Sequence, residues 1–327
     1  MASIHRRQPW QSRDLNETPE DRFIAWSQLN RRDAMRVLAA QGLVAAGLAG
    51  LPSELAAGIQ ADPKNGKEPG SEFFPAKRNE QFKLGRPITD EKAAAAYNNF
   101  YEFSTGKRVA ALVKDWQIGD WKLEVAGMVE KPATFSMDDL GRKFPYEERL
   151  YRHRCVETWS MAVPWAGFPL HKLMEQVKPL ASARFVKFVS FDHTKVKSAR
   201  RGTRAEPFPY TEGMTISEAA NELTMIVTGI YGKPLPKQHG APVRLVIPWK
   251  YGFKSAKSLV RIEFLATRPP TFWNSYAPQE YSFEANVDPT ISHPRWPQTM
   301  EWDIGNKARR PTLPFNGYGE WVASLYG

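Results

Sequence analysis

Residues 121–129 read Trp-Lys-Leu-Glu-Val-Ala-Gly-Met-Val, and this stretch gives the clearest indication of the structural class. Its apolar and polar side chains alternate, which predicts a strand with one buried face. Four other runs are rich in Val, Ile and Phe and are bounded by Gly or Pro. They predict strands over 184–191, 223–231, 242–247 and 259–265. Strands therefore dominate the predicted structure.

The predicted helices are few and short. Apolar residues at helical spacing predict one amphipathic helix over 170–177. Ser136 is placed to cap a short helix through Leu140, and Thr215 with Glu218 has the pattern of a capping box. The strands do not alternate with long helices, which argues against a doubly wound sheet. The pattern predicts an α+β fold with mixed β-sheets and few short helices.

Composition restricts the classes of function. The 327 residues are 42% hydrophobic and 24% charged, which is typical of a globular protein, and the net charge of +10 favours anionic partners. Cys155 is the one cysteine, so the chain has no internal disulfide, no zinc site with two thiolates and no Cys-ligated iron–sulfur cluster. The motifs of serine hydrolases, P-loop NTPases and dinucleotide-binding folds are also missing from the sequence.

The N-terminal region has the features of an export signal. Arg31 and Arg32 precede a short apolar run that is rich in Ala and Gly, and this arrangement resembles a twin-arginine signal peptide. The alternative is an amphipathic helix that stays on the protein. We expect a signal peptide over 1–57, a polar linker and extended arm over 58–95, and a globular domain over 96–327.

The best candidate for chemistry is the segment that contains the single thiol. Residues 151–160 read Tyr-Arg-His-Arg-Cys-Val-Glu-Thr-Trp-Ser, so Cys155 has Arg152, His153 and Arg154 beside it in the sequence. Neighbouring positive charge favours a thiolate, which is a metal ligand and a nucleophile. The alternative is a small buried hydrophobe in a strand. Glu157 either works near the thiol or forms a buried salt bridge with Arg154.

Several further motifs make the sequence recognisable. They are YNNFYEF at 97–103, RCVETWS at 154–160, GAPVR at 240–244, PWKYGFK at 248–254 and PFNGY at 314–318. From about residue 97 to the C-terminus the chain resembles the catalytic subunits of protein-methionine-sulfoxide reductases. These are molybdopterin enzymes of the sulfite-oxidase fold family, and the resemblance implies that fold and a Mo-molybdopterin cofactor.

The resemblance also implies roles for individual residues. Cys155 matches the thiolate that ligates molybdenum, and Glu157 lies close enough to orient substrate or move protons. Lys257 belongs to a loop that contacts the pterin. The positions implied to bind the cofactor are Asn98, Tyr101, Glu102, Ser190, His239, Arg244, Ser255, Ala256 and Lys257.

The residues themselves leave some of these roles open. Arg244 lies between Val243 and Leu245, so it points away from their face of the strand and is either a phosphate ligand or a solvated surface residue. Lys254 and Lys257 near Gly252 form either an anion-binding loop or an ordinary solvated turn. Only the family resemblance favours the first alternative in each case.

We expect a reductase of methionine sulfoxide residues in oxidised periplasmic proteins. By the resemblance, its electrons come from a membrane haem b subunit, and the twin-arginine translocon exports it to the periplasm. A monomer is expected, and no nucleic-acid-binding module is recognisable. The alternatives are a sulfite-oxidase-like enzyme, an oxidoreductase of small S- or N-oxides, or a basic envelope binding protein in which Cys155 is only structural.

Overall fold

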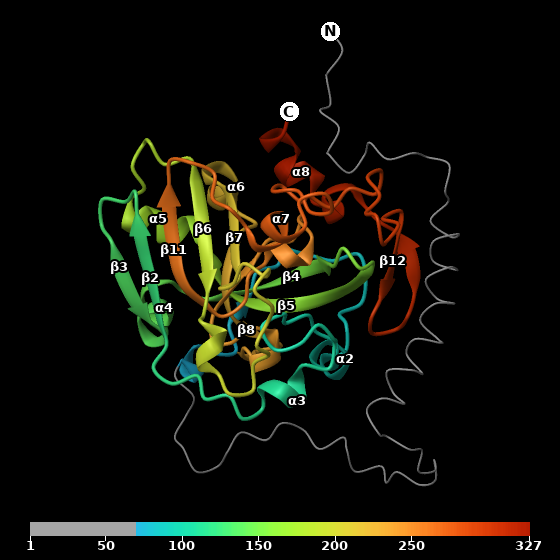
Figure 1. Ribbon diagram of the computed structural model, residues 1–327, viewed down its shortest axis with the longest axis horizontal. Helices are drawn as coiled ribbons and strands as arrows, with labels where there is room; N and C mark the ends of the chain where they lie inside the picture. Colours follow the sequence, from blue (N-terminus) through green and yellow to red (C-terminus); the bar gives the residue numbers. More distant parts are fainter. Residues whose placement is uncertain (1–69) are drawn as a thin grey trace. The chain divides into compact units, whose positions relative to one another are not determined.

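The structure is a computed structural model that describes residues 70–327. The signal peptide predicted over 1–57 and the first part of the predicted linker lie outside the described residues. The described chain is built on two β-sheets with short helices around them (Figure 1). No helix in the described part of the chain is long and apolar enough to span a bilayer.

The smaller sheet has five strands in the order β3-β2-β11-β6-β7. β2 and β11 are parallel, and the other neighbours are antiparallel, so the sheet is mixed. Its strands are β2 (Lys122–Gly127), β3 (Ala133–Ser136), β6 (Phe185–Ser190), β7 (Thr211–Thr215) and β11 (Leu259–Leu265).

The larger sheet has eight strands and carries the long hairpin of β4 and β5. β5 pairs with β4, β8 and β12, and the pairing with β12 is parallel. The strands are β1 (Lys77–Arg78), β4 (Glu147–Arg154), β5 (Trp159–Pro169), β8 (Met225–Ile230), β9 (Lys233–Pro234), β10 (Arg244–Val246), β12 (Met300–Asp303) and β13 (Arg309–Pro311).

The strand predictions over 121–129, 184–191, 223–231, 242–247 and 259–265 are all confirmed, as β2, β6, β8, β10 and β11. The β4–β5 hairpin has no counterpart among the predicted strands. β5 is buried along its whole length, so its sequence lacks the alternation that reveals a half-buried strand. The α+β class with mixed sheets is correct.

The short helices begin where local capping signals predict. Ser136 caps α4 (Met137–Lys143) in a capping box with Asp139, and Thr215 caps α6 (Ile216–Ala220). The predicted amphipathic helix is α5 (Leu170–Val177). The other α-helices are α2 (Glu91–Ala96), α3 (Ala110–Val113), α7 (Phe272–Tyr276) and α8 (Gly319–Val322). Single 3-10 turns lie at Ser71–Phe73, His193–Lys195, Lys237–His239, Gly252–Lys254, Pro314–Gly317 and Ala323–Leu325.

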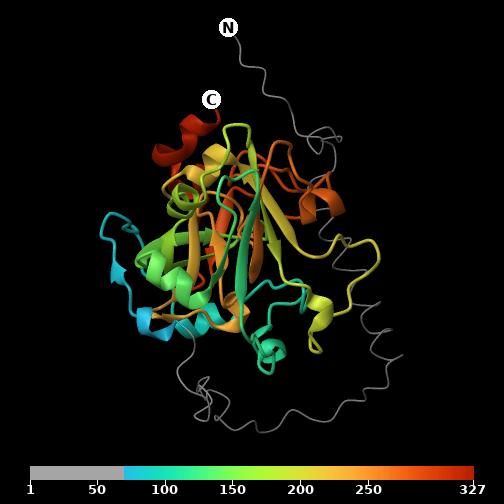
Figure 2. The same cartoon turned by 90° about the vertical axis from the view of Figure 1, so that its left-hand side faces the viewer.

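One continuous core joins the two sheets. It includes Val125 and Phe264 from the smaller sheet and Trp165 and Ile226 from the larger one. The segment before the predicted domain boundary at 96 contacts this body, because β1 pairs in parallel with β4. Figure 2 shows this arm in blue at the left-hand edge of the described residues.

Candidate active site

A tight turn between β4 and β5 positions the thiol. The Cys155 amide donates to the Trp159 carbonyl at 2.9 Å, and the Thr158 amide donates to the Cys155 carbonyl at 3.0 Å. Thr158 closes the turn with a φ of 71°. Cys155 is only 5% exposed, so the turn presents its sulfur to a small, enclosed group of neighbours.

Polar groups surround that sulfur. The Asn99 Nδ2 lies 3.4 Å from Cys155 Sγ, and the Glu157 amide nitrogen lies 3.5 Å from it. Glu157 Oε2 accepts hydrogen bonds from Asn99 at 3.1 Å and from Trp159 Nε1 at 3.0 Å, and it forms an ion pair with Lys107. The alternative pairing of Glu157 with Arg154 is wrong.

Neighbouring positive charge favours the thiolate as expected, because Lys107 and Arg154 both act to lower the pKa of the Cys155 thiol, but the effect is too small. Burial, together with Glu157, outweighs it and raises that pKa. Arg154 pairs instead with Glu301 at 3.3 Å, and burial lowers the pKa of His153 to about 3, so that imidazole is neutral. A thiolate at Cys155 therefore needs a cation that binds to the sulfur itself.

Glu157 stays ionised beside the thiol. Although burial opposes ionisation, the Lys107 ammonium lowers the pKa of this carboxyl below its ordinary value. Lys107 and Glu157 have side chains that are 22% and 25% exposed. The pair is therefore partly accessible to solvent, whereas Cys155 itself is buried.

A second group of buried residues centres on Arg244, which is 2% exposed. Its Nη1 donates to the His239 carbonyl at 2.8 Å, and its Nη2 donates to the Ser255 carbonyl at 3.0 Å. Among residues 70–327 no carboxylate pairs with it, and burial lowers its pKa to about 9. The alternative of a solvated surface arginine is wrong.

Lys257 adds a second cation to this group. Its Nζ donates to the carbonyls of Asn99 and Gln238, each at 2.7 Å, and burial, with the nearby Arg244, lowers its pKa. The charge of Lys254, in contrast, is already compensated, because this side chain forms a 2.7 Å ion pair with the buried Glu212. Of the two lysines considered for an anion-binding loop, only Lys257 has no carboxylate ion-pair partner among residues 70–327; its role toward an anion stays a prediction.

Two neutral histidines complete this buried group. Burial and the nearby Lys257 lower the pKa of His239, and its Nδ1 has no hydrogen-bond partner among the described residues. His153 faces the same cations, since Arg244 and Lys257 both lower its pKa. Glu102 acts on Lys257, and burial raises the pKa of Glu102 to about 7. This buried group therefore holds an excess of positive charge and of hydrogen-bond donors.

The loop that carries Lys257 is held from several sides. The Ser190 hydroxyl donates to the Lys257 carbonyl at 2.7 Å, and the Ser255 hydroxyl accepts from the Ile247 amide at 3.1 Å. Ala256 is buried, and its carbonyl accepts from Leu245. At Gly240, with a φ of 97°, a Cβ would lie 2.6 Å from the Lys257 Cβ, so only glycine permits this close approach.

The structure brings most of the predicted site residues together. Arg244 is hydrogen-bonded to His239 and Ser255. Ser190 is hydrogen-bonded to Lys257, whose pKa the nearby Arg244 lowers, and Lys257 connects to Cys155 and Glu157. The connection runs through Asn99, whose carbonyl accepts from Lys257 and whose amide contacts the thiol.

Two predicted residues make other contacts. The Asn98 side chain donates to the carbonyls of Ala94 and Ala95 at the end of α2. The ring of Tyr101 lies under the Arg200 guanidinium and packs against Trp273. Their roles toward a cofactor remain predictions.

The sequence analysis missed Asn99 and Lys107. Asn99 stands inside the quoted 97–103 motif, so that motif contained the signal. Lys107 follows in a polar stretch with no pattern that distinguishes it from a solvated lysine.

Comparison with known proteins identifies the family. Residues 110–273 match the family model described as "Oxidoreductase molybdopterin binding domain". A relative from Campylobacter jejuni named protein-methionine-sulfoxide reductase catalytic subunit MsrP is 52% identical over 241 residues, which are 73% of this chain and 81% of that protein. A Burkholderia mallei protein of the same name is 44% identical over 298 residues, 89% of this chain and 88% of that protein. The chain belongs to this family of catalytic subunits.

The family match establishes the class of protein and the type of cofactor. The chain is an oxidoreductase with a molybdopterin-binding domain, as predicted. A solved structure, the sulfane dehydrogenase SoxCD from Paracoccus pantotrophus, aligns with 67% of this chain and 60% of its own at a TM-score of 0.39 and 17% identity. That likeness is too weak to carry a structural argument.

The residues present fit a molybdopterin cofactor. Its phosphate needs fixed donors and positive charge, and the pocket offers Arg244, Lys257 and the unpartnered Nδ1 of His239. Its metal needs a soft ligand, and Cys155 is the single thiol. These residues would hold the cofactor, with Asn99 joining the metal end of the site to the phosphate end.

Proposed function

We propose that this protein reduces methionine sulfoxide residues in oxidised proteins, with Cys155 as the protein ligand of molybdenum. The observation that carries the proposal is the single thiol, buried beside Glu157 and joined through Asn99 to a cationic pocket. When bound, the molybdenum cofactor supplies two-electron oxygen-atom transfer. Methionine sulfoxide is a repairable lesion, and its reduction consumes two electrons and two protons and releases water.

The residues of this chain would control the protons. Glu157 Oε2 accepts from Asn99, Trp159 and Lys107, so these contacts fix the carboxylate in one place. That carboxylate in turn holds the partly exposed Lys107 ammonium through the ion pair. The ammonium can donate a proton to the sulfoxide oxygen and regain one from solvent, since it is partly exposed.

The decisive test has two parts. Purified protein from the envelope fraction is expected to contain about one molybdenum atom per chain, because one thiolate ligates one centre. With a reduced dye as electron donor, it is expected to reduce an oxidised-methionine peptide. With the oxidised dye as electron acceptor, it is expected to leave sulfite unchanged. Sulfite oxidation without sulfoxide reduction would favour the sulfite-oxidase alternative. Absence of molybdenum, in a host that loads another molybdoenzyme, would favour the binding-protein alternative.

We also propose that the protein works in the periplasm and receives electrons from a membrane haem b subunit. The paired Arg31 and Arg32 support export through the twin-arginine translocon. The relatives' designation as a catalytic subunit supports a separate electron donor. Changing both arginines to lysine should leave the precursor in the cytoplasm. Normal export of that double variant would contradict the proposed route.

A further inference from the structure

A second cluster of charged residues lies on one face of the larger sheet. In the strand register Arg154 is opposite Ser160, Ser160 is opposite Asp303, and Glu301 is opposite Arg310. Residues that are opposite each other in neighbouring strands share a face, and so do residues two apart in one strand. The five side chains therefore belong to one face of β4, β5, β12 and β13.

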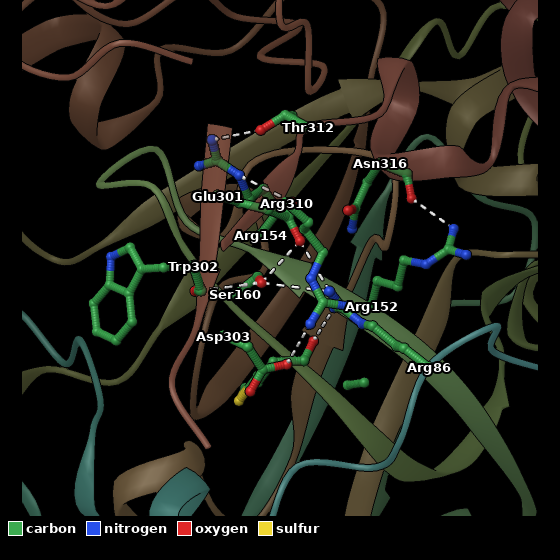
Figure 3. Close-up of polar contacts among 12 residues, drawn as sticks. Arg86, Arg152, Arg154, Ser160, Glu301, Trp302, Asp303, Arg310, Thr312 and Asn316 are labelled. Atoms are coloured by element: carbon green, nitrogen blue, oxygen red, sulfur yellow. Dashed lines mark hydrogen bonds and ion pairs between the residues drawn. The ribbon is translucent and has the colours of Figure 1, made fainter. Parts of the chain in front are cut away.

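The active site uses the other face of the same strands. His153, between Arg152 and Arg154, faces the Arg244 pocket and lies 5.8 Å from the Trp159 ring. Trp302 is opposite Trp159 in the register. Figure 3 shows the Trp302 indole pointing away from the arginines. The charged cluster is thus separate from the candidate active site.

A cavity of about 200 Å³ lies beside this cluster, with Glu301 and Arg310 in its lining. Three arginines from distant parts of the chain line it, namely Arg86 from the arm, Arg152 from β4 and Arg310 from β13, and Glu301 is the one acid in its lining. At about 30 Å³ per water, this space equals six or seven water molecules. It is large enough for a small polyatomic ion with part of its hydration.

The positive charges exceed the negative charges. Glu301 is shared between Arg86 at 2.9 Å and Arg154 at 3.3 Å, and its Oε1 also accepts from Ser160. Asp303 lies 3.6 Å from Arg310. The four guanidinium groups therefore face two carboxylates (Figure 3). Two positive charges are left over.

Arg152 is the arginine without a carboxylate partner in the described part of the chain. Its Nη1 donates to the Asn316 carbonyl at 3.1 Å. A Cβ at Gly317 would lie 2.1 Å from that same nitrogen, so the glycine leaves room for the guanidinium. The chain therefore holds an uncompensated positive charge at the cavity wall.

Unused donors accompany the unpaired charge. The Nε groups of Arg86 and Arg310 are buried and have no hydrogen-bond partner among residues 70–327. The Arg86 side chain is only 6% exposed, and burial, with Arg310 nearby, lowers its pKa. Buried donors without acceptors are rare and costly, and both of these belong to side chains that line the cavity.

We propose that this cavity binds a tetrahedral oxoanion of the phosphate class. Such an ion carries about two negative charges, which matches the excess, and guanidinium groups donate to its oxygens in pairs. The site lies behind the turn that holds Cys155, because Arg154 donates to the Cys155 carbonyl as well as pairing with Glu301. An ion bound there would fix the cluster that supports that turn.

The experiment uses the cofactor-loaded protein, so that the phosphate pocket of the cofactor is already filled. Inorganic phosphate and glycerol phosphate are titrated by calorimetry, with chloride at equal ionic strength as the blank. We expect saturable one-site binding that chloride does not reproduce. The tighter of the two ligands then tells whether the natural anion is the free ion or an ester.

Variants locate the binding. Arg310→Gln and Arg152→Gln each remove one lining guanidinium and should weaken binding about tenfold to a hundredfold, as expected for lost hydrogen bonds to a charged group. The matched control is Arg309→Gln, which removes the same charge from the neighbouring exposed position on β13, opposite Trp302 in the register. It should change the affinity less than twofold.

Two results would overturn the proposal. One is the absence of saturable binding of either phosphate by the unaltered protein. The other is a loss of affinity in Arg309→Gln equal to that in Arg310→Gln, which would indicate general charge attraction. Molybdenum content and sulfoxide reduction are measured on the same samples, so failure here is distinguishable from failure of the proposed function.

Discussion

Replacing Arg244 with methionine separates a ligand-binding role from a structural one. Burial lowers the pKa of Arg244 from 12.5 to about 9. At about 1.4 kcal/mol per tenfold change in protonation, the charged side chain destabilises the cofactor-free protein by about 5 kcal/mol below pH 9. The sign follows because the folded state binds this proton less tightly than the unfolded state. The penalty decreases as the pH rises from 9 toward 12.5.

Methionine removes that penalty but leaves two buried carbonyls without their donor. Arg244 donates to the carbonyls of His239 and Ser255, and an unsatisfied buried acceptor costs about 1–3 kcal/mol. The two effects are of similar size and opposite sign. We therefore expect the free energy of unfolding of the cofactor-free Arg244→Met variant to stay within about 3 kcal/mol of the original protein. Its molybdenum content, in contrast, should fall at least tenfold.

The matched control is Lys254→Met, which removes another buried cation from the same loop region. Lys254 has a carboxylate partner, Glu212, at 2.7 Å, and breaking a buried ion pair costs about 3–5 kcal/mol. Urea denaturation of protein from a host that makes no molybdopterin gives the stabilities, and elemental analysis of protein from a normal host gives the loading. The reasoning is refuted if Arg244→Met loses as much stability as Lys254→Met and still binds the cofactor normally.

Three further predictions concern the active site. Cys155→Ser should lose molybdenum and activity while circular dichroism shows an intact fold; a fully active serine variant would remove the thiol from the mechanism. Lys107→Met should lower kcat about a hundredfold, as for a lost proton donor. Lys107→Arg keeps the charge beside Glu157 but does not donate a proton readily, so its kcat should be similarly low; an Arg variant as active as the original protein would contradict that role. Gly240→Ala should reduce cofactor content, because an alanine in this left-handed conformation costs about 1–2 kcal/mol and its Cβ displaces Lys257. Molybdenum analysis checks this prediction, and unchanged loading would show that the loop tolerates the shift.

Local signals in the sequence were sufficient for much of the fold. Capping by Ser136 and Thr215 depends on residues three positions away, and a half-buried strand such as 121–129 shows its period within one window. The hairpin strand β5 could not be predicted in this way, since burial of both faces removes the period. Its identification requires knowledge of what packs on each side.

The site was harder, because sequence neighbours in a strand point to opposite faces. Arg154 and His153 are both close to Cys155 in the chain, but Arg154 pairs with Glu301, 147 positions later, and His153 faces the Arg244 pocket. The alternation around Arg244 gave the correct side of the strand. The pattern gave no information on the loop with Ser255 and Lys257, which buries the Arg244 side chain.

Asn99 uses its backbone for one task and its side chain for another. The carbonyl that accepts from Lys257 is present whatever amino acid stands at this position, whereas the amide that contacts Cys155 and Glu157 belongs to asparagine alone. Mutation can therefore vary the chemistry beside the thiol while the attachment of the loop that carries Lys257 is inherited unchanged. Position 99 is a place where the surroundings of Cys155 can evolve without first breaking that attachment.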